Sequence, residues 1–169
     1  YVLDPGDAEG EDNEGGQSPV PEETGGSLLI AEDNEDIAVY LRDSLSDSFE
    51  IRLARDGEQA LSAVGESLPD IVITDLNMPV MDGLKLCMRL KQNVETSDIP
   101  VIMISSENSP SCVERAYELG VSDYISRPFD ALVVQKRVKN TIMLYSKQRR
   151  LIGMVADQIY ENEKNNNIM

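Results

Sequence analysis

The chain of 169 residues is long enough for one domain with appendages, and its hydrophobic content of 41% is sufficient for a packed core. Its net charge of −16 argues against a nucleic-acid-binding protein, because phosphate contacts need a clustered basic face. The chain contains no His, which excludes His-based catalytic triads, imidazole metal sites and a phosphohistidine carrier within this piece.

The cysteines and the first residues indicate the cellular setting. Cys87 and Cys112 have neither a metal-binding spacing nor the pattern of a disulfide framework, which favours a reducing, cytoplasmic compartment. No apolar run approaches the roughly 20 residues that a membrane-spanning helix needs. The acidic first residues do not resemble a secretory signal, and because the chain does not begin with Met we expect a fragment or a processed piece.

Residues 1–26 are predicted to be a disordered acidic linker. They contain eight acidic residues, no basic residue and few aliphatic residues. Such a segment cannot bury enough apolar surface to offset the entropy lost on ordering. An acidic docking arm is the alternative interpretation, and a linker at this position suggests a further domain upstream.

From Ser27 onward, strand and helix patterns alternate five times. The predicted strands cover residues 28–31, 49–53, 71–74, 100–104 and 121–126. The predicted helices cover residues 34–48, about 83–92 and 109–120, and a last helix begins after Asp130. A further helix follows the turn at Asp56-Gly57 and ends before Leu68-Pro69. Parallel strands joined by right-handed helical crossovers are the economical arrangement of such a pattern. It predicts an α/β fold over residues 27–147, with a doubly wound five-stranded parallel sheet in a three-layer sandwich.

The last predicted helix continues beyond the domain. Apolar residues keep a 4-3-7-4-3 spacing that resembles a short heptad seam: Val138, Ile142, Tyr145, Ile152, Ala156 and Ile159, with Arg149 in the skipped slot. Gly153 weakens this helix by roughly 1 kcal/mol, and a simple helical extension remains the alternative. We predict that residues 148–169 form a helical connector to a C-terminal output domain that lies outside this piece.

Polar residues collect where the predicted strands end. The run at 71–74 ends on Asp75, and the other strand ends supply Glu32, Asp33, Ser105 and Arg127. In open α/β sheets, ligands bind at the carboxyl edge of the strands. Three carboxylates in one cleft repel each other unless a cation is present. Hard oxygen ligands, including a loop carbonyl such as that of Asn77, suit Mg²⁺.

This combination suits phosphoryl transfer. An Asp carboxylate beside a divalent cation can attack phosphorus and become an aspartyl phosphate. The cation, a hydroxyl group and a cationic side chain can then hold the three phosphoryl oxygens. Asp75, Ser105 and Arg127 are therefore the candidate catalytic residues.

Four segments closely resemble the receiver domain of two-component response regulators. They are IAEDN at 30–34, DLNMPVMDG at 75–83, PVIMIS at 100–105 and GVSDYISRPF at 120–129. The resemblance spans about residues 27–147 and implies a flavodoxin-like fold and a cytoplasmic signalling switch in a phosphorelay. It also implies Mg²⁺ as cofactor, and a sensor histidine kinase or a phosphotransfer protein as partner, with no direct nucleic-acid or membrane partner.

The resemblance assigns a role to each matching residue. Asp75 is the phosphoacceptor, and the Mg²⁺ site consists of Glu32, Asp33, Asp75 and the Asn77 carbonyl. The switch residues are Ser105, which turns toward the phosphoryl group, and Tyr124, which rotates inward when Ser105 moves. The two positions that tune phosphoryl lifetime hold Asn77 and Glu107, a pair that implies a short-lived phosphate.

Arg127 departs from the family, which nearly always has Lys before the Pro that forms a cis peptide bond. The Arg fork is wider than a Lys ammonium group, so it could bridge phosphoryl oxygens or fit badly. A second reading is therefore a pseudo-receiver, an interaction module that takes no phosphate. A third reading, an Mg²⁺-dependent phosphohydrolase, is weak because Asn77 stands where such enzymes usually have a second Asp.

The C-terminal segment suggests the output. Residues 137–169 resemble the connector between a receiver and an HD-type phosphohydrolase domain, as in regulators that degrade cyclic di-GMP. An HD site needs His, so the catalytic domain is absent from this sequence and we expect a signalling switch rather than an enzyme. A homodimer is possible through the face of helix four, strand five and helix five, or through the extended C-terminal helix.

Overall fold

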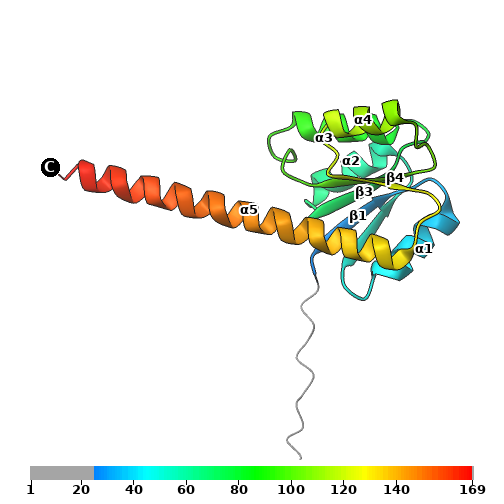
Figure 1. The fold of residues 1–169 in the computed structure, drawn as a ribbon, viewed down its shortest axis with the longest axis horizontal. Coiled ribbons are helices and arrows are strands. Elements are labelled where there is room, and N and C mark those ends of the chain that lie inside the picture. The colour runs from blue at the N-terminus through cyan, green and yellow to red at the C-terminus, as the bar shows by residue number, and fades with distance from the viewer. Residues whose placement is uncertain (1–24, 169) are drawn as a thin grey trace, which may run out of the picture.

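The computed structural model describes residues 25–168, in which five strands alternate with five helices (Figure 1). The strands are β1 (Ser27–Ala31), β2 (Glu50–Ala54), β3 (Ile71–Asp75), β4 (Val101–Ser105) and β5 (Asp123–Ser126). The helices are α1 (Glu35–Leu45), α2 (Gly57–Glu66), α3 (Gly83–Gln92), α4 (Pro110–Glu118) and α5 (Ala131–Asn166). Apart from residues 25 and 26, the linker predicted at 1–26 lies outside the described residues.

All five strands are parallel and follow the order β2-β1-β3-β4-β5. The predicted doubly wound sheet is therefore confirmed. β1 and β3 form the centre, where Ile30 pairs with Ile73 and Ala31 with Thr74. The chain reverses its direction of strand addition between these two strands, so their carboxyl ends border the crevice in which such sheets bind ligands.

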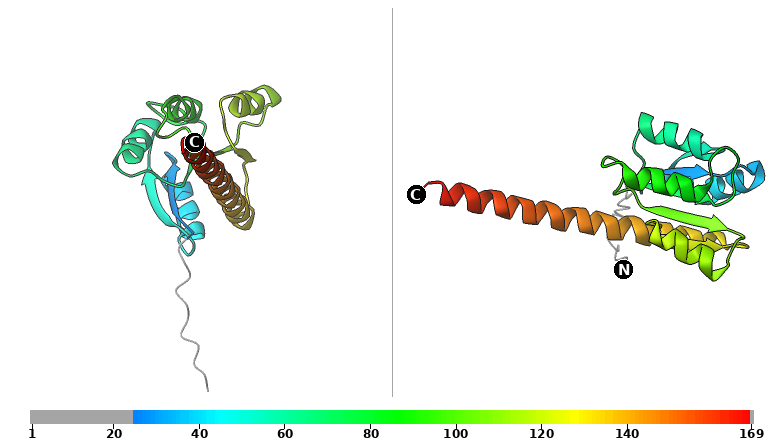
Figure 2. Two further views of the ribbon diagram at one scale, coloured as in Figure 1. Left: turned by 90° about the vertical axis from the view of Figure 1, so that its left-hand side faces the viewer. Right: turned by 90° about the horizontal axis from the view of Figure 1, so that it is seen from above.

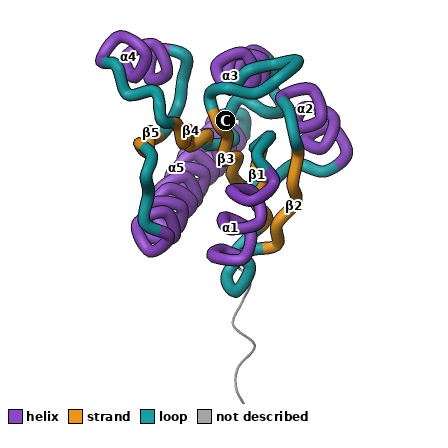
Figure 3. The backbone as a smooth tube through the Cα atoms, turned by 90° about the vertical axis from the view of Figure 1, so that its right-hand side faces the viewer, coloured by secondary structure: helices purple, strands orange, loops and turns teal. Residues whose placement is uncertain are grey.

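Helices cover both faces of the sheet (Figure 3). On one face, α2, α3 and α4 bury residues such as Val64, Leu86 and Ala116 against alternate strand residues. On the other face, α1 and α5 bury Leu41 and Val138 against the remaining strand residues. Because both faces are covered, the central strands consist of nearly continuous apolar runs.

Helix caps fix where the loops turn back from the strand ends. The side chains of Asn34, Asp56, Asp82 and Asp130 each accept a hydrogen bond from a backbone N–H in the first turn of the next helix. Ser109 precedes Pro110 but makes no such side-chain bond. Instead, the Glu107 carboxylate accepts a hydrogen bond from the Ser109 N–H at 3.1 Å.

The long helix α5 leaves the domain and continues as an isolated helix (Figure 2). The predicted heptad seam is divided by the domain boundary. Val138 is buried in the core, Ile142 packs against it, and the Tyr145 hydroxyl pairs with Ser122 Oγ at 2.8 Å. The seam residues beyond these, including Ile152 and Ile159, are exposed. Between residues 25 and 168, no helix is both long and apolar enough to cross a membrane.

Candidate functional site

Four parallel strands bring the candidate residues to one edge of the sheet. Asp75 is the last residue of β3, and Ser105 is the last residue of β4. Glu32 comes directly after β1, and Arg127 directly after β5. One carboxylate oxygen from each of Glu32, Asp33 and Asp75 lies within 4.8 Å of the other two. The acidic cluster that the strand ends predict is thus present, and it could bind a metal ion.

The loop after Asp75 turns back on the strand end and fixes it. The Gly83 N–H donates a hydrogen bond to the Leu76 carbonyl at 2.8 Å. A Cβ atom on Gly83 would lie 2.1 Å from the Asp75 carbonyl oxygen. Only glycine permits this approach, so the Asp82-Gly83 pair that begins α3 also determines where the Asp75 backbone lies.

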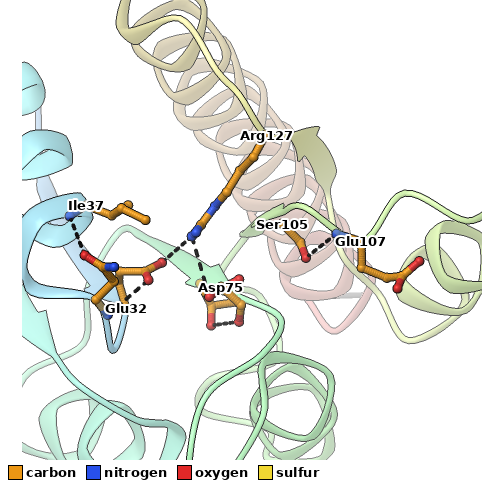
Figure 4. A network of polar contacts seen from close by, with 8 residues as sticks. Glu32, Ile37, Asp75, Ser105, Glu107 and Arg127 are labelled. Atoms are coloured by element: carbon orange, nitrogen blue, oxygen red, sulfur yellow. Dashed lines mark hydrogen bonds and ion pairs between the residues drawn. The ribbon is translucent and has the colours of Figure 1, made fainter.

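Arg127 is paired within the acidic cluster (Figure 4). Its Nη2 atom donates a hydrogen bond to Glu32 Oε2 and lies 3.5 Å from Asp75 Oδ2. The other Glu32 oxygen accepts a hydrogen bond from the Asn34 N–H at 3.2 Å. The sequence predicted that Arg127 would reach a phosphoryl group. It did not predict the Glu32 pair, which depends on the reach of the longer Arg side chain.

Burial is the main cause that raises the pKa values of the two inner acids, Glu32 and Asp75. Burial, reinforced by the nearby Asp75 charge and only partly offset by Arg127, raises the pKa of Glu32 to about 7. Burial also raises the pKa of Asp75, against the lowering effects of Arg127 and of the Leu76 and Asn77 backbone N–H groups. Both carboxylates are therefore costly to ionise in this site unless a cation offsets their charge.

This cost predicts a pH dependence of stability in the metal-free protein. The folded-state pKa of Glu32, about 7, exceeds its ordinary value of 4.5, so ionisation favours the unfolded chain. The penalty is absent below about pH 4.5, grows with rising pH and is complete above about pH 7, where it reaches roughly 3 kcal/mol. The raised pKa of Asp75 acts in the same direction.

Thermal unfolding in the presence of a chelator, measured from pH 5 to pH 8, tests this prediction. Glu32→Gln removes the larger of the two titrations, so its melting temperature should fall less than that of the wild type as the pH rises. Parallel curves for the two proteins would show that Glu32 ionises without penalty.

The two candidate switch residues meet at the backbone of Glu107. The Glu107 N–H donates a hydrogen bond to Ser105 Oγ at 3.1 Å, and the Tyr124 hydroxyl donates one to the Glu107 carbonyl. Ser105 is fully buried and Tyr124 is only 8% exposed, and burial raises the pKa of the Tyr124 phenol. The resemblance to receiver domains assigned Glu107 only a role in setting the lifetime of the phosphate. In the structure, the backbone N–H and carbonyl of Glu107 connect the two switch residues.

The structure also shows where Asn77, the Arg127–Pro128 peptide bond and Cys87 lie. Asn77 lies in the exposed loop two residues after Asp75, and its role as a carbonyl ligand stays a prediction. The Arg127–Pro128 peptide bond is cis, as the resemblance implied. Cys87, on α3, is fully buried in the hydrophobic core on that face of the sheet.

Comparison with known proteins gives a consistent picture. The profile of the family described as "Response regulator receiver domain" matches residues 28–139. The protein named Histidine kinase P4 of Formosa agariphila is 32% identical over 123 residues, which are 73% of this chain and 9% of that protein. The chain likewise spans only 14% of a second curated relative, a sensor histidine kinase.

Two solved structures show the same likeness over nearly their whole length. A putative response regulator from Chloroflexus aurantiacus aligns with a TM-score of 0.67 at 34% identity, covering 70% of this chain and 98% of that one. The Mn²⁺-bound form of response regulator Rcp1 aligns with a TM-score of 0.60 at 25% identity, covering 68% of this chain and 90% of that one.

Proposed function

The chain belongs to the family of response regulator receiver domains, and on that basis we propose that it is a phosphorylatable switch whose phosphoacceptor is Asp75. The observation that carries the proposal is the arrangement at the sheet edge. Glu32 and Asp33 lie beside Asp75, with Arg127 3.5 Å from the Asp75 carboxylate. Ser105 ends the neighbouring strand β4.

The donor set fits Mg²⁺. Three carboxylates supply hard oxygen ligands, and the Asn77 carbonyl is the proposed fourth. Burial raises the pKa of both Glu32 and Asp75, so a bound cation would favour their ionised forms. The likeness to the Mn²⁺-bound form of response regulator Rcp1 supports a divalent cation here. When bound, the cation offsets the carboxylate charge and that of the incoming phosphoryl group.

The residues of this chain divide the reaction among them. An Asp75 carboxylate oxygen attacks phosphorus, the bond from phosphorus to the donor's leaving atom breaks, and the leaving group takes the electron pair. The Arg127 guanidinium and the Ser105 hydroxyl then donate hydrogen bonds to phosphoryl oxygens. Because Ser105 and Tyr124 share the Glu107 backbone, a movement of Ser105 is passed to Tyr124.

The proposed phosphodonor is a sensor histidine kinase or a phosphotransfer protein. The likeness to a histidine kinase supports this partner class. Self-phosphorylation and dephosphorylation are the only reactions proposed for this chain. An HD-type output domain is proposed from the resemblance of residues 137–169 to a connector segment. Most of that segment lies beyond the family match, which ends at residue 139.

We also propose that the extension of α5 pairs with the same helix of a second copy. Its exposed apolar residues include Leu144, Leu151, Ile152, Val155 and Ile159. Leu144 and Leu151 are seven residues apart, as are Ile152 and Ile159, so they form one stripe along the helix. A second copy presents an identical stripe, which makes the two surfaces self-complementary.

The oligomeric state tests this pairing. Leu151→Glu places a charge in the stripe and should shift the mass measured by light scattering toward the monomer. Arg150→Glu is the matched control, because it adds an acid at the adjacent exposed position on the opposite side of the helix. A wild-type protein that is monomeric at high concentration would contradict the proposal.

Beryllofluoride, which mimics a phosphoryl group on a carboxylate, tests the proposed function. With Mg²⁺ present, the ¹⁹F NMR spectrum of the wild-type protein should show a bound signal that requires both the cation and Asp75. Asp75→Asn should lose the signal while remaining folded. Absence of a bound signal in the wild type, with Mg²⁺ binding confirmed, would favour the pseudo-receiver.

A further inference from the structure

We propose that the Arg127 guanidinium competes with the divalent cation for Glu32, and so sets the affinity of this site for Mg²⁺. The inference rests on the proposed function, which it deepens by giving the Arg at this position a role of its own. It depends on how Arg127 sits among the three acids.

A single nitrogen of Arg127 occupies the space between two candidate cation ligands. Nη2 donates to Glu32 Oε2 and is 3.5 Å from Asp75 Oδ2. These two acids and Asp33 have carboxylate oxygens within 4.8 Å of one another. A cation that binds the Glu32 and Asp75 oxygens would approach a positively charged nitrogen at close range, so this nitrogen must leave Glu32 first.

The pair is held by one end of the guanidinium only. Arg127 Nε is buried and has no hydrogen-bond partner among the residues that the structure describes. An unsatisfied buried donor makes this position costly for the side chain. The guanidinium therefore gains when it moves to acceptors that can satisfy two of its nitrogens at once, such as phosphoryl oxygens on Asp75.

A Lys at position 127 would behave differently. Its ammonium group is a compact point charge, and the Lys side chain is shorter than that of Arg. It could remain near Asp75 while withdrawing from Glu32, which would leave Glu32 free for the cation. We therefore expect the competition for Glu32 to depend on the Arg at this position, whereas a Lys would lie near Asp75 alone.

Mg²⁺ titration calorimetry without a phosphodonor measures the competition. Arg127→Lys keeps the positive charge and should tighten the dissociation constant for Mg²⁺ roughly tenfold, the effect of losing one charge-assisted hydrogen bond. Arg137→Lys is the matched control, because Arg137 also pairs with an acid, Asp123 at 3.2 Å, but outside the acidic cluster. Its affinity should equal that of the wild type.

A second measurement needs no variant. In ¹⁵N NMR spectra of the wild type, the Arg127 Nε–H resonance should shift as Mg²⁺ is added, with the midpoint found by calorimetry. Arg127→Gln distinguishes the effect of the positive charge from that of the contact with Glu32. If the net charge alone set the Mg²⁺ affinity, Arg127→Gln would bind Mg²⁺ more tightly than the wild type and Arg127→Lys would not.

The outcomes separate the two proposals. Wild-type affinity in Arg127→Lys, or an Arg127 resonance that Mg²⁺ does not move, overturns the competition and leaves the proposed function intact. If Arg127→Lys binds Mg²⁺ and the wild type does not, the result supports a competition strong enough to keep the cation out of the wild-type site. If neither protein binds Mg²⁺, both the competition and the proposed function fail.

Discussion

Gly83→Ala is expected to destabilise the domain by at least about 3 kcal/mol, because no small adjustment can accommodate the new methyl group. The added Cβ would lie 2.1 Å from the Asp75 carbonyl oxygen and 3.1 Å from Leu76 Cα, which are backbone atoms at the end of a fully buried strand. Relief requires moving α3 away from β3 or breaking the bond from the Gly83 N–H to the Leu76 carbonyl. Either movement also displaces Asp75.

Gly65→Ala is the matched control. Gly65 lies within α2 and has open space where a Cβ would be placed. Alanine is the better helix former, so this variant should gain about 0.5–1 kcal/mol. Urea denaturation of the two variants and the wild type measures both effects. The effect expected at Gly65, about 1 kcal/mol, serves as the threshold. If the free energy of unfolding of Gly83→Ala differs from that of the wild type by less than this, the loop after β3 does not fix the strand end.

Asp33→Asn is expected to weaken Mg²⁺ binding on the order of 100-fold, and to slow phosphorylation at subsaturating Mg²⁺ to a similar extent. Asp33 is the exposed member of the acidic cluster, and no hydrogen bond or ion pair of its side chain is found among the described residues. Removing its charge should therefore affect the cation and leave the fold intact.

Titration calorimetry and phosphorylation rates at several Mg²⁺ concentrations check this expectation. Asp36→Asn is the control, because Asp36 is also exposed but lies in the first turn of α1 outside the cluster. An Asp33→Asn protein with the wild-type Mg²⁺ affinity would show that Glu32, Asp75 and the loop carbonyl are sufficient for the cation.

Much of the fold follows from local patterns in the sequence. The central strands are apolar on both faces, so their runs stand out in the sequence, and the predicted helix at 83–92 coincides with α3. Strand ends then predict the acidic cluster, since parallel strands share an edge. The heptad pattern was less informative, because one apolar spacing serves both the packing of Val138 on the sheet and the free stripe that includes Ile152.

The interactions inside the site could not be predicted in the same way. Spacing along the chain placed Arg127 at the sheet edge, but whether it pairs with Glu32 or with Asp75 depends on side-chain length and burial. The link from Ser105 to Tyr124 passes through the peptide groups of Glu107, which have no signature in the residue types. Both features need three-dimensional coordinates.

The central claim is that Asp75 accepts a phosphoryl group, and intact-mass measurement tests it most directly. The protein is incubated with Mg²⁺ and acetyl phosphate beside an Asp75→Asn control. The account predicts a mass increase of one phosphoryl group in the wild type and none in the control. No increase in the wild type while Mg²⁺ is bound, or an equal increase in Asp75→Asn, would contradict it.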